Sequence, residues 1–192
     1  MQLLTNEQVA LPVNVSDLEK YLQGTDDGFY QTALTMAGEY FVAATCVELL
    51  PRQWFGQVER NGGIGGLAPI GNELDAWLGI PRWPLISVEL LKLDGVDVTP
   101  LINDKVKPAR VAVGRAKTIE IELTAGHNTV GQGSGHGHGH GATVIDERIC
   151  TAIMMLAGYI VEHRGACDLT EAAIKSGAAM LIDQLKIQRV LV

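Results

Sequence analysis

The chain has 192 residues, of which 47% are hydrophobic and 19% charged, a composition typical of a folded globular protein. Its 22 acidic and 15 basic residues give a formal net charge of −7, which excludes a surface that is basic overall and grips nucleic acid phosphates. No apolar run approaches the roughly 20 residues that cross a bilayer, and the first residues lack the pattern of a signal peptide. We therefore expect neither a usual DNA-binding protein nor a membrane or secreted one.

The three cysteines, Cys46, Cys150 and Cys167, lie in apolar, helix-like contexts and form no C-x-x-C pair. This arrangement favours reduced, buried thiols over a disulfide or a metal site, and so a reducing compartment.

Acidic residues are concentrated at the start of the chain. Residues 1–60 contain 8 acidic and 3 basic residues, a net charge of −5. One interpretation is a solvated helix face, and the other is an acidic surface that repels a passing polyanion or meets a basic partner. Composition alone does not choose between them.

Two helices are predicted within residues 10–50. Ser16 to Glu19 fits a capping box that opens a short helix ending near Gly24. Thr25-Asp26-Asp27 then provides an N-cap and two carboxylates for a long helix that runs to Leu50, where Pro51 stops it. The apolar positions of this second helix keep three-and-four spacing: Phe29, Ala33, Met36, Ala37, Tyr40, Phe41, Ala44 and Val47.

Residues 52–125 change to the pattern of β-strands. Leu85 to Leu93 alternates and is followed by Asp94-Gly95, which predicts a tight turn into Val96-Asp97-Val98 and hence a hairpin. Lys117 to Thr124 predicts a third strand with one solvated face. The predicted faces of the first strand are Leu85, Ser87, Glu89 and Leu91 on one side, and Ile86, Val88 and Leu90 on the other.

Residues 126–142 alternate glycine with other residues, which predicts a flexible loop. Within it, His136, His138 and His140 could bind zinc, nickel or copper through neutral imidazoles. A biological metal site needs fixed geometry and supporting partners, which a glycine-rich loop does not supply. We favour a solvent-exposed loop whose metal binding is adventitious. A functional metal site, a pH-dependent contact and an engineered tag are the other interpretations.

Residues 143–186 predict two further helices. Ile145 to His163 carries an apolar stripe of Ile149, Ile153, Leu156 and Ile160, which we expect to pack against the helix of residues 27–50. Asp168 to Glu171 caps the last helix, with Leu169, Ala173, Leu181 and Leu185 facing inward. The final residues, 187–192, are too apolar to extend freely into water. They either fold back over the chain's own core or form an interaction arm, since Val190 to Val192 suits an added strand on a partner's sheet.

No pattern in the chain indicates catalysis or a cofactor. The segment from Gly63 to Ala68 matches G-x-G-x-x-A, but Pro69 and Gly71 prevent the helix that a dinucleotide loop requires. Glu162-His163 is explained by its place at a helix end. The three tryptophans are interpreted as packing residues: Trp54, Trp77 and Trp83. The sequence therefore predicts a protein that is not an enzyme.

Several segments, taken in order, resemble the tailed-phage head-tail connector family, whose members are also called adaptors or head completion proteins and include the gene transfer agent adaptor. The similarity spans about residues 10–190 and consists of degenerate positions. The segments that carry it are Pro12-Val13, Thr25-Asp26-Asp27, Ile80 to Val88, Leu93-Asp94-Gly95, Ile119 to Gly126, Ile149 to Ile160 with Glu162 to Ala166, and Ile187 to Val190.

The resemblance implies a single α+β connector domain, mainly helical. A core of about four helices would carry an inserted β-hairpin or three-strand part and a C-terminal docking arm at residues 187–192. The Gly/His-rich loop of residues 126–142 departs from the family's pattern.

The same resemblance implies a structural role without cofactors. The chain would form a ring, twelvefold in the family, in the neck of a phage-like particle assembled in the bacterial cytoplasm. The ring would lie between the portal and a tail-side stopper or tail terminator protein, and DNA would pass through it without sequence-specific binding. The portal-docking role falls on Leu185, Lys186, Ile187, Gln188, Arg189, Val190, Leu191 and Val192.

Two other classes of function stay open from the residues. One is a metal-binding protein or enzyme that uses the Gly/His-rich loop, and the other is an oligomeric scaffold unrelated to phages. Acidity is compatible with a DNA conduit, because an acidic channel does not retain phosphates.

Overall fold

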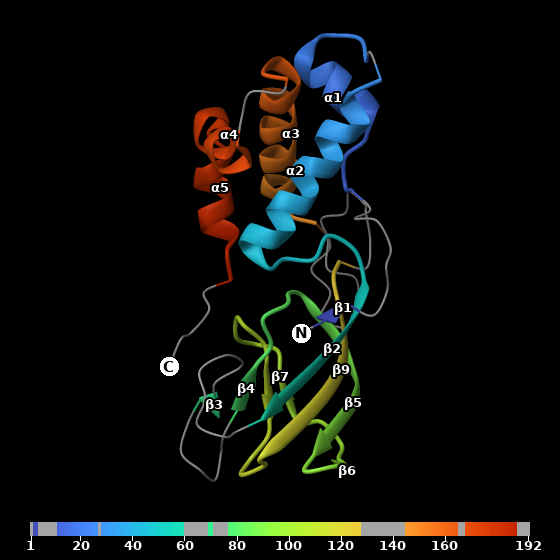
Figure 1. The fold of residues 1–192 in the computed structure, drawn as a ribbon, viewed down its shortest axis with the longest axis vertical. Helices are drawn as coiled ribbons and strands as arrows, with labels where there is room; N and C mark the ends of the chain where they lie inside the picture. Colours follow the sequence, from blue (N-terminus) through green and yellow to red (C-terminus); the bar gives the residue numbers. More distant parts are fainter. Residues whose placement is uncertain are drawn as a thin grey trace. The chain divides into compact units, whose positions relative to one another are not determined.

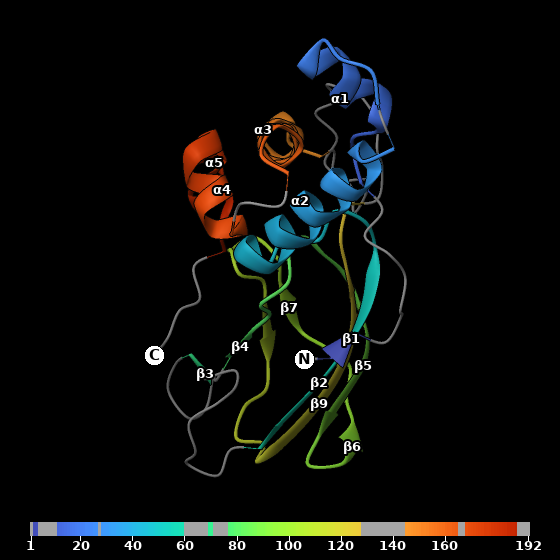
Figure 2. The same ribbon diagram turned by 45° about the horizontal axis from the view of Figure 1, so that its top comes forward.

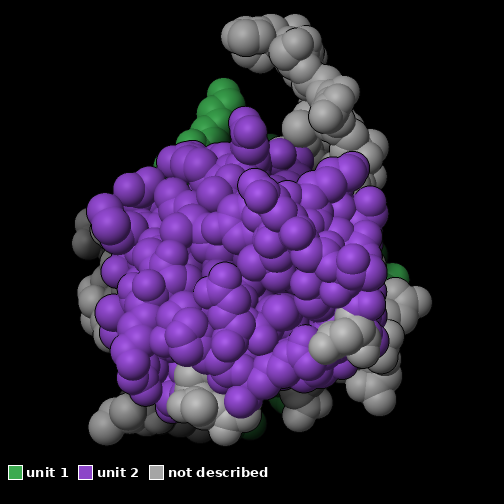
Figure 3. Space-filling view, turned by 90° about the horizontal axis from the view of Figure 1, so that it is seen from above, with its two compact units in different colours: residues 1–7, 51–126, 187–192 green, residues 8–50, 127–186 purple. Residues whose placement is uncertain are grey.

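The computed structural model describes residues 2–3, 11–26, 28–59, 69–70, 77–127, 145–164 and 168–187. Within these ranges the chain forms five helices and nine strands (Figures 1 and 2), which confirms the predicted α+β class. The chain divides into two compact units (Figure 3). We call residues 8–50 and 127–186 the helical unit, and residues 1–7, 51–126 and 187–192 the β unit.

The helical unit is organised around α3 (Glu147–Glu162), which contacts each of the other four helices (Figure 2). Its most extensive contact is with α2 (Tyr30–Thr45), as the sequence predicts. The stripe of Ile149, Ile153, Leu156 and Ile160 is buried. The remaining helices are α1 (Val15–Leu22), α4 (Leu169–Ser176) and α5 (Ala178–Leu185).

The start of α1 corrects the predicted cap. Asn14, not Ser16, is the N-cap: its Oδ1 accepts the Asp17 N–H at 3.1 Å, and an Asp17 carboxylate oxygen accepts the Asn14 N–H at 3.1 Å. The reciprocal pair is a capping box shifted two residues toward the N-terminus. This shift makes Val15 the first helical residue and leaves Leu18 fully buried.

Both ends of α2 differ from the prediction. The helix begins at Tyr30, and the Asp26 Oδ1 accepts the N–H groups of Gly28 at 2.9 Å and Tyr30 at 3.0 Å from outside the helix. It ends at Thr45, before Pro51, because Cys46 takes a left-handed conformation with φ 59°. The Thr45 hydroxyl donates to the Phe41 carbonyl and accepts the Val47 N–H.

The buried face of α2 is also rotated from the predicted one. Met36, Tyr40 and Ala44 are only partly buried. The buried residues of the helix are Tyr30, Ala33, Leu34, Ala37, Gly38, Phe41, Val42 and Thr45.

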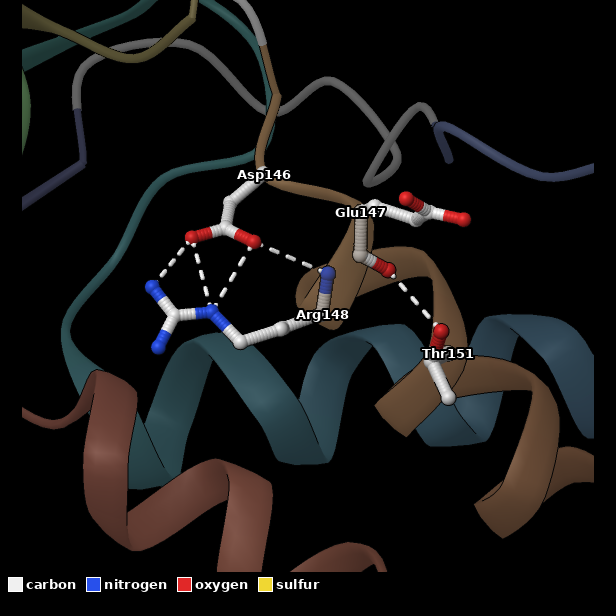
Figure 4. A network of polar contacts seen from close by, with 4 residues as sticks. All are labelled: Asp146, Glu147, Arg148 and Thr151. Carbon is white, nitrogen blue, oxygen red and sulfur yellow. Dashed lines mark hydrogen bonds and ion pairs between the residues drawn. The ribbon is translucent and has the colours of Figure 1, made fainter.

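The start of α3 is fixed by a local polar network (Figure 4). Asp146 is the N-cap and accepts the Arg148 N–H at 2.9 Å, while the Arg148 guanidinium binds both carboxylate oxygens of Asp146. The pKa of Arg148 is raised, first by this hydrogen bonding and then by the charge of Asp146. The Glu147 side chain points away from the network, and its carbonyl accepts the Thr151 hydroxyl at 3.0 Å.

The last predicted helix is two helices. Gly177 has φ 80° and separates α4 from α5, so the helical phase restarts at Ala178. Ala173 is buried as predicted, whereas Leu181 and Leu185 are half-buried and Ile182 takes the inward position. The prediction placed Gly177 inside a helix, but its left-handed backbone is typical of a helix end.

The β unit contains two antiparallel sheets within the described residues. The first has the order β1-β2-β9-β5-β6, and the second has the order β3-β4-β8-β7. The strands are β1 (Gln2–Leu3), β2 (Arg52–Glu59), β3 (Pro69–Ile70), β4 (Trp77–Gly79), β5 (Leu85–Leu93), β6 (Val96–Asp97), β7 (Ile102–Asn103), β8 (Arg110–Ala112) and β9 (Thr118–Ala125). This β part is larger than the three strands expected from the sequence.

The predicted hairpin is confirmed, since β5 pairs with β6 and Leu93 lies opposite Val96. The alternating faces predicted for β5 are wrong. Register irregularities occur between Leu85 and Ser87 and between Val88 and Leu90, where β5 pairs with β9. Each irregularity changes which side chains face the core, so Leu91 is buried while Glu89 is exposed.

The core of the β unit lies on one face of β9. Ile119, Ile121, Leu123 and Ala125 are buried there, and the intervening residues are only partly covered. Leu78 and Ile80 contribute to the same cluster. Trp54 also belongs to it, with the Arg82 guanidinium 3.8 Å from its ring centroid.

Candidate interaction surfaces

The two units differ completely in net charge. The helical unit contains 12 acidic and 5 basic residues and carries the whole net charge of −7, whereas the β unit contains 10 of each and is neutral. Six of the eight acidic residues counted in residues 1–60 therefore belong to the acidic helical unit.

A basic segment within the β unit is hidden by this neutral total. Residues 105–117 contain Lys105, Lys107, Arg110, Arg115 and Lys117 and no acidic residue. All five are exposed except Arg110, which is half-buried. This basic segment was not predicted above, although the net charge of successive short windows of the sequence is highest there.

The backbone of β8 directs Arg110 outward. Ala109, Val111 and Val113 are buried, so the alternation of the strand places Arg110 and Ala112 on the opposite face. The Lys107 Nζ lies 4.8 Å from the centroid of the Trp83 ring, a cation–π contact. Among the described residues, no carboxylate forms an ion pair with Lys105, Lys107 or Arg110.

An apolar side chain shares this outward face. Asn103 pairs with Arg110, and the Leu101 carbonyl accepts the Ala112 N–H at 3.0 Å, so Leu101 lies beside Arg110 on the same face of the sheet. Leu101 is 64% exposed. We define the β7–β8 surface as Leu101, Lys105, Lys107 and Arg110.

The helical unit exposes apolar and acidic side chains on its last two helices. Ile174 on α4 is 66% exposed and Met180 on α5 is 72% exposed. Glu171 and Asp183 are exposed on the same two helices, and Glu171 pairs with Lys175 at 2.5 Å. We define the α4–α5 surface as Glu171, Ile174, Met180 and Asp183.

The tip of the β5–β6 hairpin is held by the Asp94 carboxylate. Its Oδ1 accepts the N–H groups of Lys117 at 2.7 Å and Thr118 at 2.8 Å. These backbone hydrogen bonds are the main reason that the pKa of Asp94 lies below its usual value. Asp94 has φ 52°, and the nearby Val96 is 63% exposed.

Other polar groups have local roles. The His163 ring stacks on Tyr159 at 3.9 Å, and its Nδ1 lies 3.1 Å from the Tyr159 carbonyl, at the end of α3. Cys46 and Cys150 form no disulfide within the described residues, and burial is the main cause that raises the pKa of Cys150. Cys167 lies outside the described residues. Trp77 and Trp83 are half-buried.

The predicted docking segment is only partly described. Leu185 is half-buried at the end of α5, Lys186 is exposed, and Ile187 is 5% exposed. Gln188, Arg189, Val190, Leu191 and Val192 lie outside the described residues.

The candidate metal ligands His136, His138 and His140 also lie outside the described residues, as do Gly63 to Ala68. Within the part of the chain that the structure describes, no three His, Cys, Asp or Glu residues gather as they would around a metal ion. A search of the described helices finds none with the length and hydropathy that crossing a bilayer requires.

Comparisons with known proteins find similarity in structure and not in sequence families. No family model and no curated protein matches the sequence. A chain in the neck of a native gene transfer agent particle, computed with C12 symmetry, is 20% identical with a TM-score of 0.61, and the match covers 100% of this chain and 98% of that one.

Two further structures agree. A chain of the virion of a native gene transfer agent particle is 18% identical with a TM-score of 0.64, covering 99% of this chain and 96% of the other. A chain in the neck of an empty particle, computed with C6 symmetry, is 19% identical with a TM-score of 0.59, covering 100% and 98%. The chain therefore has the fold of these gene transfer agent chains, and its resemblance to head-tail connectors is confirmed at the level of the fold.

Proposed function

We propose that this chain is a structural head-tail connector, or adaptor, of a gene transfer agent or phage-like particle. Copies of it form a ring in the particle neck, between the portal and the tail-side proteins, and the ring continues the DNA channel. The observation that carries this proposal is the fold match over essentially the full length to chains in necks computed with C12 and C6 symmetry.

The charge of the chain supports a role beside moving DNA. The helical unit has a net charge of −7, and an acidic wall repels phosphates. A wall that captured phosphates would release DNA slowly and in a salt-dependent way. The proposed role is structural and needs no catalytic group and no cofactor. We expect the particle to assemble in the bacterial cytoplasm.

The test is the loss of the gene in the cell that produces the particle. A head without its connector ring has no place for the tail to attach, so cells without this chain should yield heads that lack tails, counted by electron microscopy. A plasmid copy of the gene should restore tailed particles. Normal numbers of tailed particles in its absence would contradict the proposal.

The same assay tests the docking segment, Leu185 to Val192. Because Ile187 is buried, removal of residues 188–192 is a cleaner test than truncation after Lys186. The shortened protein should keep the melting temperature of the full chain but bind the portal less tightly and produce few tailed particles. Undiminished portal binding by the folded, shortened protein would show that the segment is not a docking arm.

A triple variant tests the alternative function, a metal-binding protein or enzyme that uses the Gly/His-rich loop. Replacement of His136, His138 and His140 by alanine should leave the number of tailed particles unchanged, since we expect only adventitious metal there. A folded triple variant that produces no tails would instead make the loop a functional site.

A further inference from the structure

The β7–β8 surface and the α4–α5 surface complement each other. The first combines exposed Leu101 with Lys105, Lys107 and Arg110, and it belongs to the basic segment of residues 105–117. The second combines exposed Ile174 and Met180 with acidic side chains, and it belongs to the acidic helical unit. Each surface exposes apolar side chains. The basic segment of residues 105–117 and the acidic helical unit carry net charges of opposite sign, although exposed Lys175 is paired with Glu171 on the second surface.

We infer that the β7–β8 surface of one copy docks on the α4–α5 surface of a second copy. This inference rests on the proposed function, in which the chain forms a ring. A closed ring needs a heterologous interface, in which every copy offers two different faces. The two surfaces lie on different compact units of the chain, so each copy carries one of each.

A polyanion such as DNA is the competing partner for the basic segment. Two observations favour a protein partner over a polyanion. Leu101 is 64% exposed on the same face as Arg110, and a phosphate backbone offers no apolar surface to cover it. In addition, β7 is the edge strand of its sheet within the described residues, and edge strands with exposed apolar side chains are usually covered by protein.

On both surfaces some charged groups form no ion pair within the described residues, whereas Glu171 is already paired with Lys175. Lys105 and Arg110 form no ion pair with the described carboxylates, and the ammonium group of Lys107 contacts the Trp83 ring. Asp183 is exposed and likewise forms no ion pair within the described residues. Opposite charges brought together at an interface increase the association rate and exclude wrong partners.

The experiment compares two exposed apolar residues of the β unit by sedimentation equilibrium. Leu101→Asp places a carboxylate on the β7–β8 surface, while Val96→Asp, at 63% exposure, places one on the other sheet. We expect Leu101→Asp to weaken self-association about tenfold or more and Val96→Asp to leave it unchanged. Circular dichroism should show both variants folded, because both positions are exposed.

Charge reversal tests the partner surface. Lys105→Glu with Lys107→Glu should weaken association, and adding Asp183→Lys to the same chain should restore part of it, because opposite charges again face each other. Met180→Asp should weaken association as Leu101→Asp does. Lack of any rescue, together with unchanged association of Met180→Asp, would assign the basic surface to another partner and overturn the inference.

Three further results would contradict the inference and leave the proposed function unaffected. The first is equal association of Leu101→Asp and Val96→Asp, and the second is a wild-type protein that stays monomeric up to about 1 mM. The third is tight binding of a duplex DNA that the double lysine variant loses while its self-association is normal. Failure of the proposed function is seen separately, as normal tails in cells without the gene.

Discussion

The helical unit and the β unit of this chain differ in the chain segments that form them and in their net charge. The β unit is formed mainly by one continuous segment, residues 51–126, together with the short terminal segments 1–7 and 187–192, and its net charge is zero. The helical unit joins residues 8–50 to residues 127–186 and carries the entire charge of −7. The difference shows that the net charge of a whole chain can hide a basic segment, here residues 105–117 with 5 cations, that belongs to a neutral unit.

The largest effects should come from charges placed in the two cores. Ile153→Asp in α3 and Ile121→Asp in β9 each bury a carboxylate at a fully buried position and should cost about 3 to 5 kcal/mol. We expect Ile153→Asp to abolish soluble folded protein or to remove amide exchange protection from the helical unit. Ile121→Asp should remove it from the β unit.

The control for these core variants is Thr32→Asp, at an exposed position of α2. Its melting temperature should match that of the wild-type protein. An unchanged melting temperature for Ile153→Asp would show that the α3 stripe is not core, and simultaneous loss of protection in both units would show that the units fold as one.

A matched pair of glycines gives a smaller effect. Gly177 in the helical unit and Gly95 in the β unit have φ 80° and 79°, so alanine is strained at both, by about 1 kcal/mol. A Cβ at Gly177 would lie 3.1 Å from the Met155 Cε, whereas a Cβ at Gly95 meets nothing within 4 Å. Gly177→Ala should therefore lower the denaturant midpoint more than Gly95→Ala. Equal midpoints would show that the Met155 methyl moves aside at no cost.

The smallest effects concern two exposed carboxylates, Asp94 in the β unit and Asp168 at the N-cap of α4. Backbone N–H groups hold both pKa values below the usual value of 3.8. The stabilisation is therefore complete above pH 3.8 and is lost as the pH falls through the lowered pKa of the folded protein. Alanine at either position should reduce the loss of stability on acidification.

Thermal melts between about pH 2 and pH 6 measure this effect. At neutral pH, Asp94→Ala should be the more damaging variant, since Asp94 has φ 52° and Asp168 has φ −63°. Asp94→Asn tolerates the left-handed conformation and isolates the charge. A pH dependence that is unchanged in both alanine variants would remove these carboxylates from the acid response.

The sequence predicted the elements whose signals are local. Asp94-Gly95 between alternating strands gave the hairpin, and the stripe through Ile153 gave the central helix. The faces of β5 could not be predicted, because its register irregularities depend on pairing with β9. Asn14 and Ser16 are both good N-caps with an acidic residue three positions on, so local chemistry did not separate them.

The candidate surfaces were less accessible to sequence reasoning than the fold. The cations of residues 105–117 are visible in the sequence, but β7 and β8 are only two and three residues long and carry no clear alternation. Only their pairing shows that Leu101 lies beside Arg110. The exposure of Met180 follows from the break at Gly177, which restarts the helical phase, and Ile174 is exposed on the helix before that break.

The insertion of the β unit into the helical unit has a consequence for synthesis on the ribosome. Residues 51–126 leave the ribosome as one segment that contains β2 to β9, whereas α2 must wait for α3, which ends at Glu162. At about 5 to 20 residues per second, the 37 residues between Ala125 and Glu162 take roughly 2 to 7 seconds. During that interval α1 is already made, but the face of α2 that packs on α3 is still uncovered, so the nascent chain is the stage at which this protein most needs a chaperone.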